Sequence, residues 1–241
     1  MEKMKTVLIV LLLMVISNIA YAQNLTIGIK DGISHSDIKF EYKDFNDSRY
    51  FRVNSLKGGR NFGLVLNYQI TNFFSIQSEL YHSEKGFEFD LCSNMDGGPG
   101  VFGDYKMNYI TIPLLANFEI GKSFKFYGYG GLYMSFLNSA KNQTTLTSTA
   151  SSDFPHYDYS YDPTSEFYSS EKGALFGLGV RIPLCNKVKL FVDTRYETGL
   201  TNASRDDVEY KYYHVICDFE DVYNRSVSFN WGILYRFKSP E

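Results

Sequence analysis

Strict alternation of apolar and polar side chains recurs along this chain and limits what it can fold into. In residues 226–238, Val227, Phe229 and Trp231 begin one face, and Ser228 and Asn230 begin the other. Such side chains point to opposite faces of a β-strand. Seven further segments share the pattern, although interleaved tyrosines leave the facing of the fifth ambiguous: 25–30, 61–70, 74–81, 109–118, 124–137, 176–182 and 188–197. The sequence therefore predicts an all-β fold of eight strands.

The connections between these segments alternate between short and long. Those near residues 71–72, 121–123 and 185–187 are tight, whereas those around 37–58, 84–104, 138–172 and 200–225 are long and polar. Up-and-down barrels of the bacterial outer membrane have short periplasmic turns, long external loops and strands of about 9–11 residues. We therefore expect an eight-stranded antiparallel transmembrane β-barrel, with both termini at the periplasmic end.

The first residues predict export. Lys3 and Lys5 precede an unbroken apolar run over residues 7–16, and Ala20-Tyr21-Ala22 forms a small-x-small cleavage site. This is the pattern of a secretory signal peptide. A membrane anchor needs about 20 apolar residues, roughly twice this run. We expect a signal peptide over residues 1–22, a barrel domain over 23–241 and a location in the outer membrane of a Gram-negative bacterium.

Composition helps to separate a membrane barrel from a soluble one. Aromatic residues make up 17% of the chain, and many lie near the strand ends, as in the aromatic girdles of membrane barrels. The face opposite the apolar side chains carries mainly Gly, Ser, Asn, Gln and Tyr, which suits a filled polar lumen. A secreted, lipocalin-like carrier of a hydrophobic ligand is the soluble alternative. The net charge of −3 does not indicate the basic surface that nucleic-acid binding requires.

Eight strands enclose a space that side chains can fill, so the inward face predicts a barrel that conducts no solute. Its charged residues should form ion pairs across neighbouring strands, because unpaired buried charges are costly. We expect Asp193 and Glu197 to hold the arginines. The full inward charged set is Lys30, Glu79, Arg181, Lys189, Asp193, Arg195, Glu197 and Arg236.

A family resemblance follows from two neighbouring segments. YITIPLLANF at residues 109–118 and FYGYGGLY at 126–133 are similar to the PorT-like outer-membrane β-barrel family, as are QSELY at 77–81 and GLG at 177–179. The resemblance implies a small outer-membrane barrel without catalytic residues, in contact with outer-membrane lipids and assembly machinery. Because proline lacks the N–H that a ladder needs, we expect a bulge at Pro113.

No residue pattern predicts an enzyme, cofactor or metal site. None of the four histidines, His35, His82, His156 and His214, has a partner at metal-ligand spacing, and no nucleophile elbow or phosphate loop is present. The alternative is a lipid-modifying enzyme of the outer membrane, for which His82 would be the base. We therefore predict no catalytic, cofactor-binding or metal-binding residue.

The function predicted from sequence is non-enzymatic, with external loops displayed to partners. Residues 157–162, YDYSYD, resemble polar aromatic surfaces that bind proteins or glycans, and the family name suggests an accessory role in envelope or secretion machinery. Cys92 and Cys217 lie in loops on one side of the membrane and Cys185 on the other. Whether Cys92 and Cys217 form a disulfide is left open, as are the partner and the oligomeric state.

Overall fold

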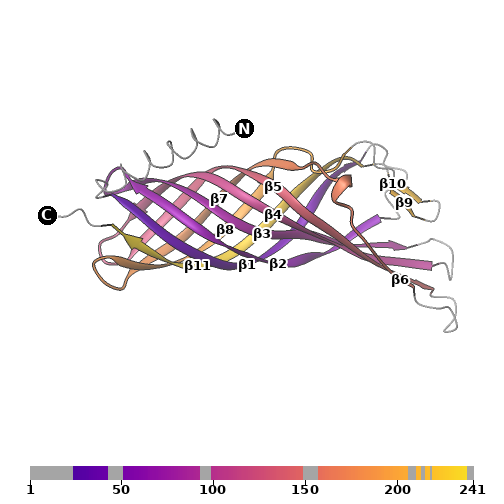
Figure 1. Ribbon diagram of the computed structural model, residues 1–241, viewed down its shortest axis with the longest axis horizontal. Coiled ribbons are helices and arrows are strands. Elements are labelled where there is room, and N and C mark those ends of the chain that lie inside the picture. The colour runs from indigo at the N-terminus through magenta and orange to yellow at the C-terminus, as the bar shows by residue number, and fades with distance from the viewer. Residues whose placement is uncertain are drawn as a thin grey trace, which may run out of the picture.

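The computed structural model describes residues 24–42, 51–92, 99–148, 157–205, 210–212, 215–217 and 219–237. Its eight long strands form a barrel (Figure 1): β1 (Leu25–Tyr42), β2 (Phe51–Gln69), β3 (Phe74–Cys92), β4 (Pro99–Ile120), β5 (Lys125–Ser148), β7 (Ser170–Pro183), β8 (Val188–Gly199) and β11 (Phe219–Arg236). Short elements are β6 (Tyr157–Tyr161), the 3-10 helix η1 (Thr164–Glu166), β9 (Tyr210–Tyr212) and β10 (Val215–Cys217). Among the described residues, no helical segment has the length and hydropathy of a transmembrane helix.

Each long strand pairs antiparallel with its neighbours in the chain, and β1 pairs with β11 to close the barrel. The register measures how far the strands are staggered. A path of paired residues that leaves β1 at Asp37 through Arg225 returns to β1 at Ile27, ten residues away. Eight strands with a stagger of ten tilt strongly against the barrel axis. The expected up-and-down topology is confirmed.

The two ends of the barrel differ. Short connections over residues 70–73, 121–124 and 184–187 share one end, which we call the turn end. The Phe237 amide donates to the Leu25 carbonyl at 3.1 Å, so the first and last described strands also meet there. Gly121 has a φ of +115°, which lets β4 turn tightly toward β5. The opposite end, which we call the extended end, carries β6, β9 and β10 (Figure 1).

Much of what the sequence predicted as long loops is strand. The pairing of β3 with β4 continues to Cys92 opposite Gly100, and that of β4 with β5 continues to Pro99 opposite Ser148. In these segments the outward face carries polar residues such as Glu88, Asp104 and Lys106, while Phe87, Tyr105 and Met107 are buried on the inward face, so the polarity of the alternation is reversed although backbone pairing persists. We call these continuations the sheet extension, which comprises residues 51–60, 84–92, 99–108, 138–148 and β6 (Figure 1).

The facing of the barrel strands agrees with the alternation. Val227, Phe229 and Trp231 point outward and are half exposed, while Ser228 and Asn230 are buried in the lumen. In a lipocalin the apolar side chains point into the barrel and the polar side chains point outward. The arrangement here is the reverse, so the soluble alternative is wrong. Outward ion pairs, Asp37–Arg225 at 2.7 Å and Glu84–Lys106 at 3.1 Å, mark where the apolar face ends.

The fifth segment, which the sequence left ambiguous, places its tyrosines inward. Tyr127, Tyr129 and Tyr133 of β5 are buried, each opposite a glycine of β7. Glycine leaves room for a ring to lie across the neighbouring strand, and a Cβ on Gly177 would lie 2.5 Å from the Tyr129 ring. The tyrosines therefore reach over β7 toward β8.

The bulge expected at Pro113 is absent. Pro113 lies opposite Tyr133 in a continuous register with β5, and the register with β3 is the same on both sides of the proline. The strand stays regular because the proline removes only one backbone N–H donor from the sheet. The Pro113 carbonyl accepts a hydrogen bond from Ser78 Oγ at 3.0 Å. The irregularity in β4 instead lies between Asn108 and Tyr109, where the sheet extension begins.

Candidate functional site

The centre of the lumen is organised around Glu79. Its carboxylate accepts two hydrogen bonds from the Arg195 guanidinium, at 2.8 and 3.0 Å, and one from Lys30 Nζ at 2.6 Å. Gln77 donates to the same carboxylate at 2.7 Å. Glu79 and Lys30 are 4% exposed and Arg195 is 2% exposed, so these charges are shielded from solvent on all sides. Glu79 joins three strands, β1, β3 and β8.

Asp193 does not hold an arginine, contrary to the sequence prediction. It accepts hydrogen bonds from the Tyr127 hydroxyl at 2.8 Å, the Tyr129 hydroxyl at 3.0 Å and the Asn230 amide at 2.9 Å. The register explains this, because Gly179 lies between Tyr127 and Asp193 on the three adjacent strands. A tyrosine that crosses a glycine reaches the carboxylate beyond it.

The predicted ion pair of Glu197 with an arginine is present but long, at 3.9 Å from Arg195. Glu197 has closer contacts, because it accepts a hydrogen bond from the Tyr81 hydroxyl at 2.5 Å and lies 3.5 Å from Lys85 Nζ. The arginines have their shorter ion pairs with Glu79, as above, and with Glu119, which pairs with Arg181.

Three buried lumen charges were missed by the sequence analysis: Lys85, Glu119 and Glu171. Lys85 Nζ lies 3.6 Å from Glu171, which also accepts from the Tyr133 hydroxyl at 2.6 Å. Lys85 and Glu171 fall in segments assigned to loops, and Glu119 lies one residue beyond its predicted strand. Extending the alternation of inward-facing residues along each strand would have identified these three charges as inward. Of the predicted set, Lys189 and Arg236 are only partly buried.

Toward the extended end the lumen filling becomes apolar. We call this part the aromatic cluster. The Phe87 and Tyr105 rings stack with centroids 4.8 Å apart, and Phe167, just after η1, meets Tyr105 edge-on at 5.8 Å. Its buried members are Ile38, Phe87, Phe89, Tyr105, Met107, Tyr109, Ala140, Phe167 and Val222. The lumen is therefore filled in two layers, an ion-pair network and then an apolar cluster.

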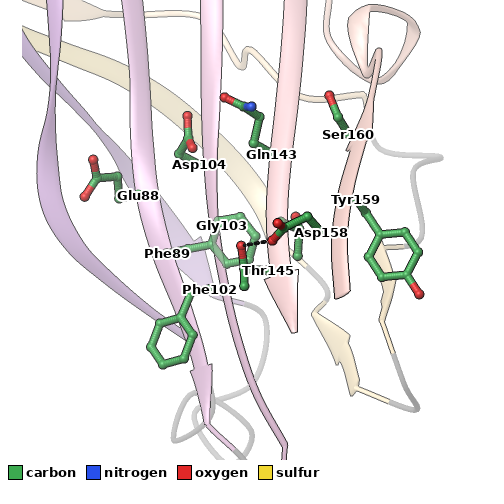
Figure 2. A pocket seen from close by; sticks show the side chains of 11 residues that line it. Glu88, Phe89, Phe102, Gly103, Asp104, Gln143, Thr145, Asp158, Tyr159 and Ser160 are labelled. Atoms are coloured by element: carbon green, nitrogen blue, oxygen red, sulfur yellow. Dashed lines mark hydrogen bonds between the residues drawn. The ribbon is translucent and has the colours of Figure 1, made fainter. Parts of the chain in front are cut away.

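A groove of about 600 Å³ lies on the sheet extension. Figure 2 shows a polar row, formed by Glu88, Asp104, Gln143 and Ser160, that runs across the neighbouring strands β3, β4, β5 and β6. The remaining lining residues are Phe89, Phe102, Gly103, Thr144, Thr145, Asp158 and Tyr159. The groove thus includes part of the YDYSYD segment that the sequence marked as a contact surface.

Neighbouring side chains fix the carboxylates of the groove. Lys57 of β2 lies 2.8 Å from Asp104 and 3.8 Å from Glu88, so one ammonium group holds two carboxylates. The Thr145 hydroxyl donates to Asp158 at 2.8 Å, which Figure 2 shows as a dashed line. These oxygens keep acceptor capacity toward the groove, because a carboxylate has about four lone-pair sites.

The structure does not assemble a catalytic group around His82. Its ring stacks on Phe62 with centroids 5.1 Å apart, and its buried Nδ1 has no hydrogen-bond partner, whereas a base is normally oriented by a third group. His35 is exposed on β1, and His156 and His214 lie outside the described residues. Within the described part of the chain, no three His, Cys, Asp or Glu residues are arranged to hold a metal.

The cysteines are described only in part. Cys185 is an exposed free thiol at the turn end. The side chains of Cys92 and Cys217, whose pairing the sequence left open, lie outside the described part of the structure. The predicted signal peptide likewise lies outside it.

Comparisons with known proteins agree on the barrel. Residues 21–205 match the model of the outer membrane protein beta-barrel domain family. Similar solved structures include OprG of Pseudomonas aeruginosa (15% identity, 90% of this chain and 97% of that chain, TM-score 0.46) and the attachment invasion locus protein Ail of Yersinia pestis (16%, 88% and 99%, TM-score 0.39). Neisserial surface protein A is another (12%, 88% and 97%, TM-score 0.39). No curated protein sequence matches significantly. Because the identities and TM-scores of these structures are low, the family match alone supports the assignment.

Proposed function

Because this chain belongs to the outer membrane protein beta-barrel domain family, we propose that it is a non-enzymatic surface protein that presents its sheet extension outside the cell. The barrel resides in the outer membrane, where its apolar outward side chains contact lipid. The finer PorT-like assignment, and with it an accessory role in envelope or secretion machinery, is part of the proposal and rests on the segments at residues 109–118 and 126–133.

Orientation follows from the general rule for these barrels. The turn end faces the periplasm and the extended end faces outward, as in outer-membrane barrels with short periplasmic turns. Export depends on the predicted signal peptide over residues 1–22, and insertion depends on the outer-membrane assembly machinery. The outward-facing groove on the sheet extension is then available to partners from outside the cell.

The filled lumen is the observation that carries the proposal. Glu79, Arg195 and Lys30 occupy the centre with their charges paired, and the aromatic cluster fills the extended end. A solute would have to displace buried ion pairs and then an apolar layer, and breaking one such pair costs about 3–5 kcal/mol. The barrel therefore acts as a membrane anchor and not as a pore.

Recordings from planar lipid bilayers test this function. Purified, folded monomer should give no stable conductance, while a general porin reconstituted in the same bilayers confirms that channels would be detected. Reproducible open steps from the monomer would refute the proposed anchor function.

A further inference from the structure

We propose that the groove on the sheet extension is a binding site for a neutral saccharide. This inference deepens the proposed function and rests on it, because the groove must face outward from the cell. A volume of about 600 Å³ lies in the usual range for small-ligand sites.

The position of the groove places it beside the barrel, above the lipid. On β4, the sheet extension begins at Asn108, and Gly103 at the groove lies five residues further on. At about 3.3 Å per residue and a tilt of about 40°, this is roughly 12 Å beyond the rim. Most of the lining side chains are on the outward face of the strands, so a ligand would lie laterally, at the height of the sugars that cover the outer leaflet.

The chemistry of the polar row matches hydroxyl groups. Glu88 and Asp104 offer carboxylate acceptors already held in place by Lys57. Gln143 offers both an amide donor and an acceptor, and Ser160 a hydroxyl that can do either. A saccharide presents successive hydroxyls that both donate and accept, and it can therefore satisfy a row of mixed groups on adjacent strands.

An apolar contact completes the site. Phe102 lies in the groove beside this row and is 41% exposed, so its ring is available to a ligand. The negative face of an aromatic ring attracts the weakly positive C–H groups that cover one face of a sugar ring. Polar side chains beside an accessible aromatic ring form a surface that is suited to a pyranose.

The same residues argue against other ligands. The described residues that line the groove include the carboxylates Glu88, Asp104 and Asp158 and no lysine or arginine, so a sulfated or phosphorylated ligand would be repelled. A peptide that adds a strand would pair with backbone groups along the free edge of β6, whereas the polar row runs across four strands and presents side chains. A metal is disfavoured by the absence, among the described residues, of a suitable ligand group.

Binding to defined disaccharides tests the proposal. Full-length protein is folded in a zwitterionic or amine-oxide detergent, because maltoside and glucoside detergents carry the ligand chemistry themselves. Saturation-transfer NMR and calorimetry then measure cellobiose, maltose and chitobiose, with sulfated maltose as the anionic counterpart. We expect at least one neutral disaccharide to bind and the sulfated form to bind more weakly.

Matched variants locate the binding. Gln143→Ala and Phe102→Ala should each weaken the bound disaccharide about fivefold or more, the effect of losing one good contact. Lys141→Ala, two residues from Gln143 on the same exposed face of β5, should leave affinity unchanged. Heat-modifiable gel migration checks that each variant is folded, and Gln143→Glu keeps the shape of the side chain if an alanine variant fails.

A second arm identifies the source of the saccharide. Neutral oligosaccharide released from the bacterium's own outer membrane is compared with the free disaccharides, and stronger binding of the former assigns the groove to the cell's own surface sugars. The proposal is overturned if no neutral saccharide binds, if sulfated maltose binds more tightly, or if both groove variants bind like the native chain. A conductance-free barrel that fails these tests would still satisfy the proposed function.

Discussion

At the scale of single residues, Glu79 is the carboxylate whose loss should matter most. Its removal in Glu79→Ala leaves Arg195 and Lys30 buried without their principal counter-ion. Removing one partner of a buried pair costs about 3–5 kcal/mol, because the remaining charge is stranded. We expect a loss of this size in the free energy of unfolding, measured by urea titration in lipid vesicles with the fluorescence of Trp231.

The control is another carboxylate on the same strand. Glu88 is 45% exposed at its side chain and lies 3.8 Å from Lys57, so Glu88→Ala should change stability by no more than about 1 kcal/mol. Equal losses from Glu79→Ala and Glu88→Ala would show that the central network contributes nothing specific to stability.

Partner choice inside the lumen could not be read from the sequence. Parity along a strand identifies Asp193 as inward, and it is. Its partners depend on the register of two neighbouring strands, which brings Tyr127 across Gly179 to the carboxylate. Register is set by the closure of the whole barrel, so local pattern predicts which residues meet the lumen and not which ones bind each other.

At the scale of elements, the glycines of β7 are needed for the tyrosines of β5 to cross that strand. A Cβ on Gly177 would lie 2.5 Å from the Tyr129 ring and from the Thr194 carbonyl oxygen, so Gly177→Ala forces the ring or the strand to move. Overpacking of this kind costs about 1–3 kcal/mol. We expect the loss in the same vesicle-unfolding assay.

An outward glycine provides the control. For Gly130 of β5, the nearest atom to an added Cβ is 3.7 Å away, so Gly130→Ala should be almost neutral. If Gly130→Ala were as destabilising as Gly177→Ala, the cost would reflect the loss of glycine in any strand and not the tyrosine packing.

The outward face of β11 makes a prediction about depth in the membrane. Trp231 is the middle of the exposed series 227, 229, 231, 233 and 235, whereas Val227 lies next to the Arg225–Asp37 ion pair at the rim. An arginine on the lipid face costs about 2–4 kcal/mol at the midplane and about 0–1 near the interface. The free energy of unfolding should therefore fall more between Trp231→Ala and Trp231→Arg than between Val227→Ala and Val227→Arg. Unfolding in vesicles is followed here by circular dichroism, because the variants at position 231 lack the chain's one tryptophan. Equal costs would show that position 231 lies no nearer the midplane than position 227.

Strand ends were the least predictable feature of the elements. The alternation of residues 109–118 is visible because one face meets lipid, and its polarity reverses beyond Tyr109, where the outward face of β4 becomes polar and Met107 and Tyr105 lie inward. Backbone pairing continues there to Pro99, supported on the inward side by the aromatic cluster. Backbone pairing does not depend on which face is apolar, so the sheet extension, with its polar outward face, and its groove were hidden in what the sequence predicted as loops.

At the scale of the whole molecule, the barrel was predictable from the number of alternating segments and the lengths of their connections. Eight alternating segments with connections of alternating length permit an up-and-down barrel whose last strand meets its first, as the pairing of β1 with β11 confirms. The candidate groove was predictable only as the YDYSYD segment of β6. Its other lining residues come from three more strands, and only the twist and register of the sheet extension bring them together.

The orientation of the whole barrel makes a final prediction, which uses cysteine labelling. Cys185 is exposed at the turn end, so in a Cys92→Ser, Cys217→Ser background it reports on one side of the membrane. Adding Cys185→Ser and Tyr159→Cys to that background moves the thiol to the extended end, where Tyr159 is 50% exposed. A polymer-linked maleimide too large to cross the intact outer membrane should label the thiol at position 159 on whole cells. It should label Cys185 only after the outer membrane is permeabilised, since turns of this kind face the periplasm. Labelling of Cys185 on intact cells would place the turn end outside, and the groove would then face the periplasm instead of the surroundings of the cell.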